Sequence, residues 1–97
     1  MTAPTYRPDT TVITSGRTGG ETALAPTLYA STTFATTTVD EGRRMATDPN
    51  ENHFYTRYGN PTIAAFEDAM AELEGAESAR AFSSGMGAIS AVVMGLC

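Results

Sequence analysis

The chain has 97 residues, of which 41% are hydrophobic and 18% charged, a balance typical of globular proteins and not of disordered tails or coiled coils. Eleven acidic residues against six arginines give a net charge of −5, so a nucleic-acid partner is not expected. No apolar run approaches the roughly 18 residues that span a bilayer, and the N-terminus lacks the apolar core of a signal peptide. The single cysteine, Cys97, cannot form a disulfide within the chain, which fits a reducing compartment. We therefore expect a cytoplasmic protein, and we expect neither a membrane partner nor a metal site.

The sequence contains no lysine. Schiff-base chemistry on a protein requires a lysine amine, so this chain supplies no catalytic residue of that kind, and any such lysine must lie outside it. Thr, Pro and Gly are frequent in the first half, whereas Ala, Met, Val and Leu gather after Ile63. This asymmetry predicts a core that begins near the end of the chain, as in a truncated domain.

Residues 1–36 are predicted to be extended or irregular, because Pro4, Pro8, Pro26 and the pair at 19–20 interrupt any helical period. Such a stretch usually wraps around something, so we expect an arm that reaches over a neighbouring subunit. After it, Thr38 and Glu41 have the spacing of a capping box and predict a short helix over 39–46.

The clearest predicted helix follows a turn at 48–52 and an aromatic, basic stretch at 53–59. Asn60 is a suitable N-cap, Pro61 suits the first helical position, and Gly75 supplies the end. Between them apolar residues repeat every three or four positions, at Ile63, Phe66, Met70 and Leu73. The opposite face is expected to lie in water and carries Glu67, Asp68, Glu72 and Glu74.

Residues 78–83 are predicted to form a short strand, followed by a turn at 84–87 and a helix over 88–96. This last helix has no polar face, which predicts burial on all sides in a layered α/β protein. A glycine turn that opens a helix can bind an anion, because the first helical amides have no internal partner and carry partial positive charge. Ser84, Gly85 and Gly87 suit a phosphate, but a plain turn that uses glycine for tight packing explains them equally well.

Tyr55 and Arg57 form a second candidate anion site. In an extended segment, residues two apart point the same way, so both side chains can reach one phosphate. The planar guanidinium donates two parallel hydrogen bonds to phosphate oxygens. The alternative is a surface aromatic cluster with a solvated arginine, and His53 is interpreted as a surface histidine.

Three sequence strings, in this order, resemble one enzyme family: YTRYGNPT at 55–62, LEGAE at 73–77 and SSGMGAI at 83–89. Residues 26–34, PTLYASTTF, look like its N-terminal stretch. The family is the Cys/Met-metabolism enzymes that depend on pyridoxal 5′-phosphate (PLP). It includes cystathionine γ-synthase and γ-lyase, methionine γ-lyase and the homoserine-ester sulfhydrylases. The resemblance runs from about residue 10 to the end of the chain.

The resemblance implies a role for four residues. Tyr55 and Arg57 match the pair that reaches from one subunit to the PLP phosphate of its neighbour, while Gly85 and Met86 match the loop whose amides hold the phosphate within a subunit. Gly87 departs from the family pattern, in which alanine is commoner. The family's ring-stacking tyrosine, its aspartate beside the pyridine nitrogen and its Schiff-base lysine have no counterpart in this chain.

The resemblance also implies an aspartate-aminotransferase-like α/β fold. Residues 1–59 would be the arm that contacts a neighbouring subunit, and 60–97 would begin the PLP-binding domain. The protein would be a homo-oligomer, a dimer of active dimers, that performs γ-elimination or γ-replacement on a small amino acid such as cystathionine, a homoserine ester or methionine.

Two alternatives belong to other classes. The first is a non-catalytic, truncated fragment, which the absence of lysine favours for the chain by itself. The second is a stand-alone nucleotide or phosphate module, but residues 84–87 fit neither the Walker pattern nor the dinucleotide fingerprint. As an isolated chain, we expect weak folding and aggregation through the apolar last helix.

Overall fold

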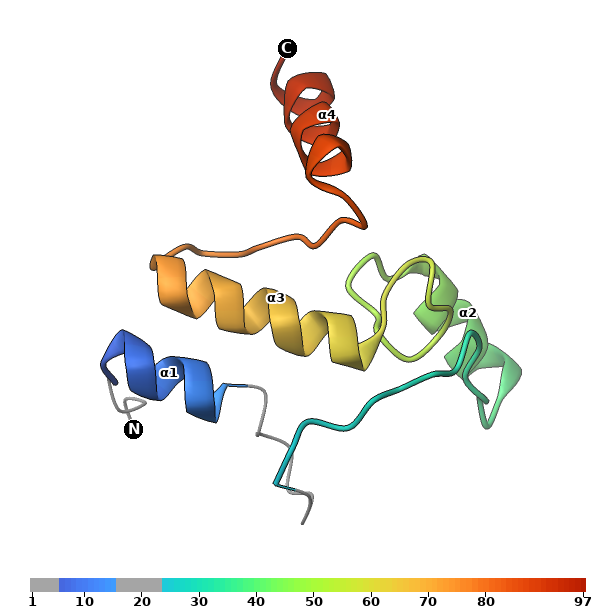
Figure 1. Cartoon of the computed structure of the whole chain (residues 1–97). Coiled ribbons are helices and arrows are strands. Elements are labelled where there is room, and N and C mark those ends of the chain that lie inside the picture. The colour runs from blue at the N-terminus through green and yellow to red at the C-terminus, as the bar shows by residue number, and fades with distance from the viewer. Residues whose placement is uncertain (1–5, 16–23) are drawn as a thin grey trace.

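The computed structural model describes residues 6–15 and 24–97. Within them the chain forms four α-helices (Figure 1). They are α1 (Pro8–Thr14), α2 (Val39–Thr47), α3 (Pro61–Glu74) and α4 (Gly85–Leu96). Helix α3 lies in the middle with α1 alongside it, whereas α2 lies beyond the end where α3 begins and α4 stands away above α3 (Figure 1).

Helix α3 forms as its sequence predicts, because both of its ends are specified locally. The Asn60 side chain accepts a hydrogen bond from the Thr62 amide at 2.8 Å, and Pro61 occupies the first helical position. At the other end Gly75 adopts the left-handed conformation with φ 63°, which glycine enters without the steric cost of a Cβ. The predicted helix, with its start and its end, is confirmed.

Helix α1 corrects the prediction that residues 1–36 are irregular throughout. Pro8 begins this helix and does not interrupt it, and Asp9 lies in the first turn, where a negative charge is favourable. Thr11 is buried at 4% exposure, and α1 is the helix that packs on α3. The parts of the same prediction that fall on residues 1–5 and 16–23 lie outside the described residues, while 25–36 lack a helix as expected.

Helix α2 confirms the predicted capping motif. The Glu41 amide donates to the Thr38 hydroxyl at 3.1 Å. The Glu41 carboxylate accepts from the Thr37 hydroxyl and from the Thr37 amide, not from the Thr38 amide of an ideal capping box. These hydrogen bonds, with that of the hydroxyl foremost, hold the pKa of the Glu41 carboxyl below its ordinary value.

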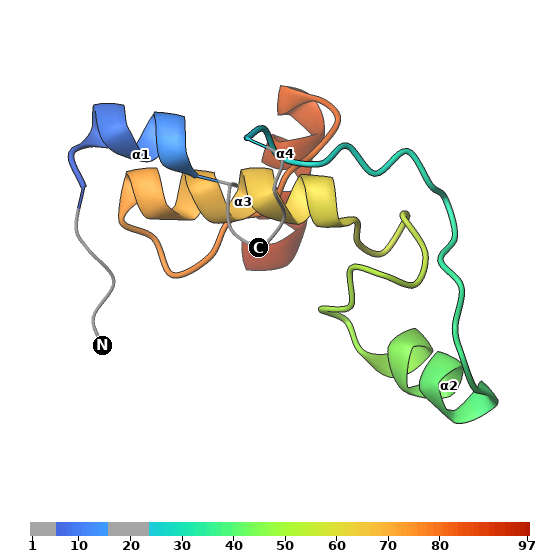
Figure 2. The same ribbon diagram turned by 90° about the horizontal axis from the view of Figure 1, so that it is seen from below.

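The segment between α3 and α4 contradicts the predicted strand at 78–83. The chain runs back along α3 without a strand assignment (Figures 1 and 2). A strand needs a partner for its backbone groups, and the described residues offer this segment none. Helix α4 then begins at Gly85, three residues before the predicted start, because Ser84 caps it.

No hydrophobic side chain among the described residues is buried. On α4, Met94 and Leu96 are 81% and 82% exposed, so the expected burial of this helix on all sides is wrong for the chain as it stands. The Cα radius of gyration is 15.5 Å, above the ~13 Å of a compact domain of about 100 residues. The described residues therefore lack the sheet that a layered α/β fold requires. No helix among them has the length and apolar character needed to cross a bilayer.

Candidate functional site

A network of hydrogen bonds around Asn60 and Thr62 joins the start of α3 to two segments before it. The Asn60 amide donates to the Tyr29 carbonyl and to the Thr56 hydroxyl, each at 3.1 Å. The Thr62 hydroxyl accepts from the Tyr29 amide at 2.8 Å and donates to the Thr27 carbonyl at 3.0 Å. We call residues 27–34 and 54–62 together the clamp. Asn60 is its most buried residue, at 3% exposure.

The two segments of the clamp also pair with each other. An isolated antiparallel bridge joins Thr33 to Tyr55. The Thr56 amide donates to the Thr32 carbonyl at 2.8 Å, and the Phe34 amide donates to the Phe54 carbonyl at 3.2 Å. One of the predicted site residues, Tyr55, is therefore fixed by backbone pairing.

The Tyr55 and Arg57 side chains lie together, as the sequence predicts. An Arg57 guanidinium nitrogen is 3.4 Å from the Tyr55 hydroxyl, and the guanidinium carbon lies 5.1 Å from the centre of the Tyr55 ring. The predicted reason was wrong, because residues 56–58 form a turn and not an extended segment. In this turn the Tyr58 amide donates to the Tyr55 carbonyl at 2.9 Å.

Gly59 closes this turn at a point where only glycine fits. A Cβ at this position would lie 2.6 Å from both the Asn52 side-chain oxygen and the Glu51 carbonyl. Glu51 also orients His53, whose amide donates to its carboxylate at 2.7 Å. The His53 ring packs edge-on against Tyr29 and Phe34, so this histidine lies in an aromatic cluster beside the clamp.

The start of α4 presents the second pair of predicted site residues. The Ser84 hydroxyl accepts from the Gly87 amide at 3.0 Å, and the Ser84 carbonyl accepts from the Ala88 amide at 3.1 Å. The amides of Gly85 and Met86 occupy the two helical positions before these, where a helix offers no internal acceptor. We call residues 84–87 the phosphate turn. Its geometry leaves two adjacent N–H groups at the positive end of α4.

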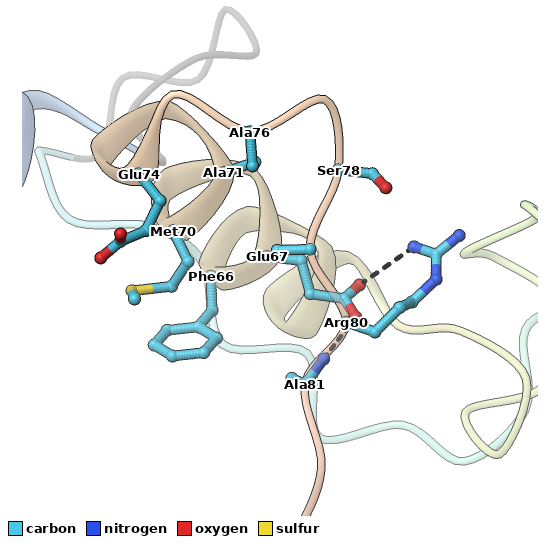
Figure 3. Close-up of a pocket in the computed structure, with 10 residues that line it drawn as sticks. Phe66, Glu67, Met70, Ala71, Glu74, Ala76, Ser78, Arg80 and Ala81 are labelled. Carbon is cyan, nitrogen blue, oxygen red and sulfur yellow. Dashed lines mark hydrogen bonds and ion pairs between the residues drawn. The ribbon is translucent and has the colours of Figure 1, made fainter. Parts of the chain in front are cut away.

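Glu67 connects the segment before the phosphate turn to α3. Its carboxylate accepts from the Ala81 amide at 2.7 Å and lies 3.8 Å from the Arg80 guanidinium. Its side chain is only 15% exposed, so the expectation that this residue lies in open water is wrong. Figure 3 shows Glu67 pointing from α3 toward Arg80 and Ala81, along a pocket of about 340 Å³ lined also by Phe66 and Met70.

The structure does not bring the two predicted pairs together. Arg57 lines a cleft of about 410 Å³ between the turn at 49–59, the first turns of α3 and residues 80–82. Gly85 and Met86 do not line this cleft. The separation is compatible with the implied arrangement, in which each pair serves the phosphate of a different subunit.

Sequence reasoning missed the roles of Asn60, Thr62 and Glu67. Asn60 was predicted only as a cap, and Thr62 and Glu67 were assigned no contacts outside their helix. Their partners lie far away in sequence, up to 35 residues for the contact of Thr62 with Thr27. The string NPT at 60–62, which is part of the family resemblance, contains Asn60 and Thr62 and is the one sequence feature that could have drawn attention to them.

Comparison with known proteins identifies the family. A family model described as Cys/Met metabolism PLP-dependent enzyme matches residues 9–97. The chain belongs to this family. The Cys/Met-metabolism enzymes depend on PLP, so the cofactor implied for this chain is PLP.

Curated relatives of two kinds match the chain. L-methionine gamma-lyase of Pseudomonas deceptionensis is 51% identical over 69 residues, which are 71% of this chain and 17% of that protein. O-succinylhomoserine sulfhydrylase of Pseudomonas aeruginosa is 45% identical over 78 residues, 80% of this chain and 18% of that protein. L-methionine gamma-lyase of Streptomyces avermitilis is 62% identical over 40 residues, 41% of this chain and 10% of that protein. The chain thus spans less than a fifth of these relatives, and no solved structure matches it.

The described residues fit the phosphate group of PLP. The phosphate turn offers two N–H groups without internal acceptors, and a Cβ at Gly85 would meet nothing within 4 Å, so the approach to the turn is open. Arg57 is exposed, with its guanidinium beside the Tyr55 hydroxyl. Both pairs supply hydrogen-bond donors, and neither contains a carboxylate that would repel the anion.

Proposed function

We propose that this chain supplies the phosphate contacts of a PLP-dependent sulfur amino-acid enzyme. In this proposal Tyr55 and Arg57 bind the phosphate of a neighbouring subunit's PLP, and the amides of Gly85 and Met86 bind the phosphate of the chain's own PLP. The observation that carries it is the side-by-side placement of the Tyr55 hydroxyl and the Arg57 guanidinium, 3.4 Å apart on one turn.

The protein that carries this chain is proposed to catalyse γ-elimination or γ-replacement on a small sulfur amino acid, a homoserine ester or cystathionine. The activities for which the relatives are named, those of a methionine γ-lyase and an O-succinylhomoserine sulfhydrylase, support this reaction class. PLP supplies the electron sink for chemistry at the substrate α-carbon. The residues described here hold and orient the cofactor, and they transfer no proton.

The proposed architecture follows the family. Residues 1–59 act as an arm toward a second subunit, residues 60–97 begin an α/β PLP-binding domain, and the working protein is a homo-oligomer. A face of α4 made of Ile89, Val92, Val93 and Leu96 is exposed in the chain alone, which supports a covering layer that these residues do not themselves provide.

A second candidate is a chain without catalytic activity of its own. The absence of lysine from the 97 residues favours it, because no Schiff base can form on this chain. The two candidates differ in one respect, namely whether a lysine of the same polypeptide reaches the cofactor. Intact mass of the protein from its source, before and after borohydride reduction, separates them by the presence or absence of covalently retained PLP.

The phosphate assignment is tested with Arg57→Leu in the whole protein that carries this chain. We expect PLP to bind about 10- to 100-fold more weakly, because a charge-assisted hydrogen bond to phosphate is lost. Pyridoxal, which lacks the phosphate, should bind wild type and variant alike. Arg57→Lys is the matched control, since it keeps the charge without the planar fork and should be intermediate. An equal loss for PLP and pyridoxal would contradict the assignment.

A further inference from the structure

The clamp contains more hydrogen bonds than the capping of α3 requires. Capping uses the side-chain oxygen of Asn60, which accepts from the Thr62 amide. Aspartate or serine would serve equally well for this purpose. The amide nitrogen of Asn60 donates instead to the Tyr29 carbonyl and the Thr56 hydroxyl, both outside the helix. Asparagine therefore does more than cap the helix, because its amide nitrogen also binds the two segments that pass beside α3.

The pairing of these segments is too short to hold by itself. The two backbone hydrogen bonds that form the Thr33–Tyr55 bridge join 32–34 to 54–56, and an isolated two-stranded pair is at best marginally stable in water. The side-chain contacts supply what the backbone lacks. Thr56 donates to the Ser31 carbonyl at 2.5 Å while it accepts from Asn60, so one hydroxyl links both segments to the start of α3.

Burial makes the network costly to break. Asn60 is 3% exposed, and hydrogen bonds shielded from water are stronger than exposed ones. If Thr62 loses its hydroxyl, the part-buried Tyr29 amide loses this acceptor at a desolvation cost, whereas the exposed Thr27 carbonyl can bind water instead. Tyr55 lies in the bridge and Arg57 in the turn directly after it, so any loosening of this pairing reaches the two phosphate ligands.

We propose that Asn60 and Thr62 are positioning residues that hold Tyr55 and Arg57 in their phosphate-binding arrangement before the cofactor arrives. This inference rests on the proposed function, because it takes Tyr55 and Arg57 as ligands of the phosphate. Neither Asn60 nor Thr62 touches the cofactor. Both act by fixing residues 27–33 against 54–56, which lowers the ordering cost of phosphate binding.

The test compares PLP and pyridoxal affinity in the cofactor-free form of the whole protein for Thr62→Val, Thr62→Ser and Asn60→Asp. Thr62→Val removes both hydrogen bonds of the hydroxyl at nearly constant volume, and we expect about tenfold weaker binding of PLP. Asn60→Asp keeps the cap but removes both donors, and should behave similarly. Thr62→Ser retains the hydroxyl and should bind PLP as the wild type does. Pyridoxal affinity should change less than twofold in all three.

Two results would overturn the proposal. One is wild-type PLP affinity in Thr62→Val, and the other is an equal loss for PLP and pyridoxal, which would indicate general damage to the fold. The double variant of Thr62→Val with Arg57→Leu should lose less PLP affinity than the product of the two single losses, because only Tyr55 is then left for Thr62 to position. Failure of the proposed function looks different: Arg57→Leu itself would then leave PLP affinity unchanged.

Hydrogen exchange on the wild type tests whether the clamp is ordered before PLP binds, even if Thr62→Val does not fold. In the cofactor-free protein, the amides of Thr56 and Phe34, which donate across the bridge, should already be protected. Protection that appears only when PLP is added would mean that the phosphate orders the clamp, and the proposal would then be wrong.

Discussion

The clamp and the segment from 76 to 97 are both proposed to bind phosphate, yet they are held in opposite ways. The clamp satisfies its polar groups within the chain, around a residue that is 3% exposed. The segment from 76 to 97 is tied to α3 through Glu67, and its last helix exposes Val92 and Val93 by more than half. Hydrogen bonds within the chain thus hold the first proposed half-site, whereas the second needs packing that the described residues do not provide.

Asn60→Ala should break the clamp with the largest effect. The change removes the cap of α3 and leaves the Tyr29 carbonyl short of a donor, so we expect local opening to become easier by about 2–4 kcal/mol. Native-state hydrogen exchange at the Tyr29 and Thr62 amides measures this. Asn50→Ala is the control, because Asn50 is exposed and its side-chain oxygen accepts a single hydrogen bond within the described residues, from Arg80 at 3.4 Å. Equal effects of Asn60→Ala and Asn50→Ala would contradict the claim that the Asn60 hydrogen bonds hold the clamp together.

Glu67→Ala should loosen the other region. The Ala81 amide loses its acceptor, and we expect residues 79–82 to open more easily by about 1–3 kcal/mol, measured by exchange of the Ala81 amide. Glu67→Gln keeps an acceptor and loses only the ion pair with Arg80, whose side chain is 66% exposed, so it should cost under about 1 kcal/mol. If both variants opened this segment equally, the ion pair and not the hydrogen bond would be the connection.

Ser84→Asp should weaken phosphate binding at the phosphate turn. Aspartate and asparagine both cap helices well, so Ser84→Asp and Ser84→Asn should keep α4. The added negative charge repels a phosphate held by the Gly85 and Met86 amides, and we expect PLP to bind about tenfold more weakly to the aspartate variant than to the asparagine variant. The difference should shrink as salt is added. Identical PLP affinities would place the phosphate elsewhere.

Thr37→Ala has the smallest expected effect and lies outside both regions. Loss of the hydroxyl that donates to the Glu41 carboxylate should raise the pKa of this carboxyl toward its ordinary value, as followed by NMR titration. Since the pKa is lowered in the folded chain, the contribution to stability is present above the ordinary value and is lost as the pH falls through the lowered one. The Thr37→Ala variant should lose part of this acid sensitivity, and an unchanged Glu41 pKa would show that the Thr37 hydroxyl does not cause the shift.

The sequence predicted the elements whose determinants are local. Helices α2 and α3 have their caps in adjacent residues, at Thr38 and Asn60, and both form where expected. The strand at 78–83 was predicted wrongly, because short alternation does not show whether a partner strand is present. Helix α1 was missed because Pro8 was taken as an interruption, although proline is favourable in the first turn.

The candidate site likewise has one part that adjacent residues determine and another that depends on residues distant in sequence. The pairing of Tyr55 with Arg57 follows from adjacent residues, and the structure places the two side chains together. The contacts of Asn60 with Tyr29 and of Glu67 with Ala81 span 31 and 14 residues, and neither periodicity nor composition encodes such distances. The assignment of all four ligands to a phosphate stays a prediction that rests on the family.

The most direct measurement is an experimental structure of the whole protein with PLP bound. The account predicts that each phosphate contacts the Tyr55 hydroxyl and the Arg57 guanidinium of one subunit and the Gly85 and Met86 amides of another. A phosphate held by other residues, or by both pairs from a single chain, would contradict it.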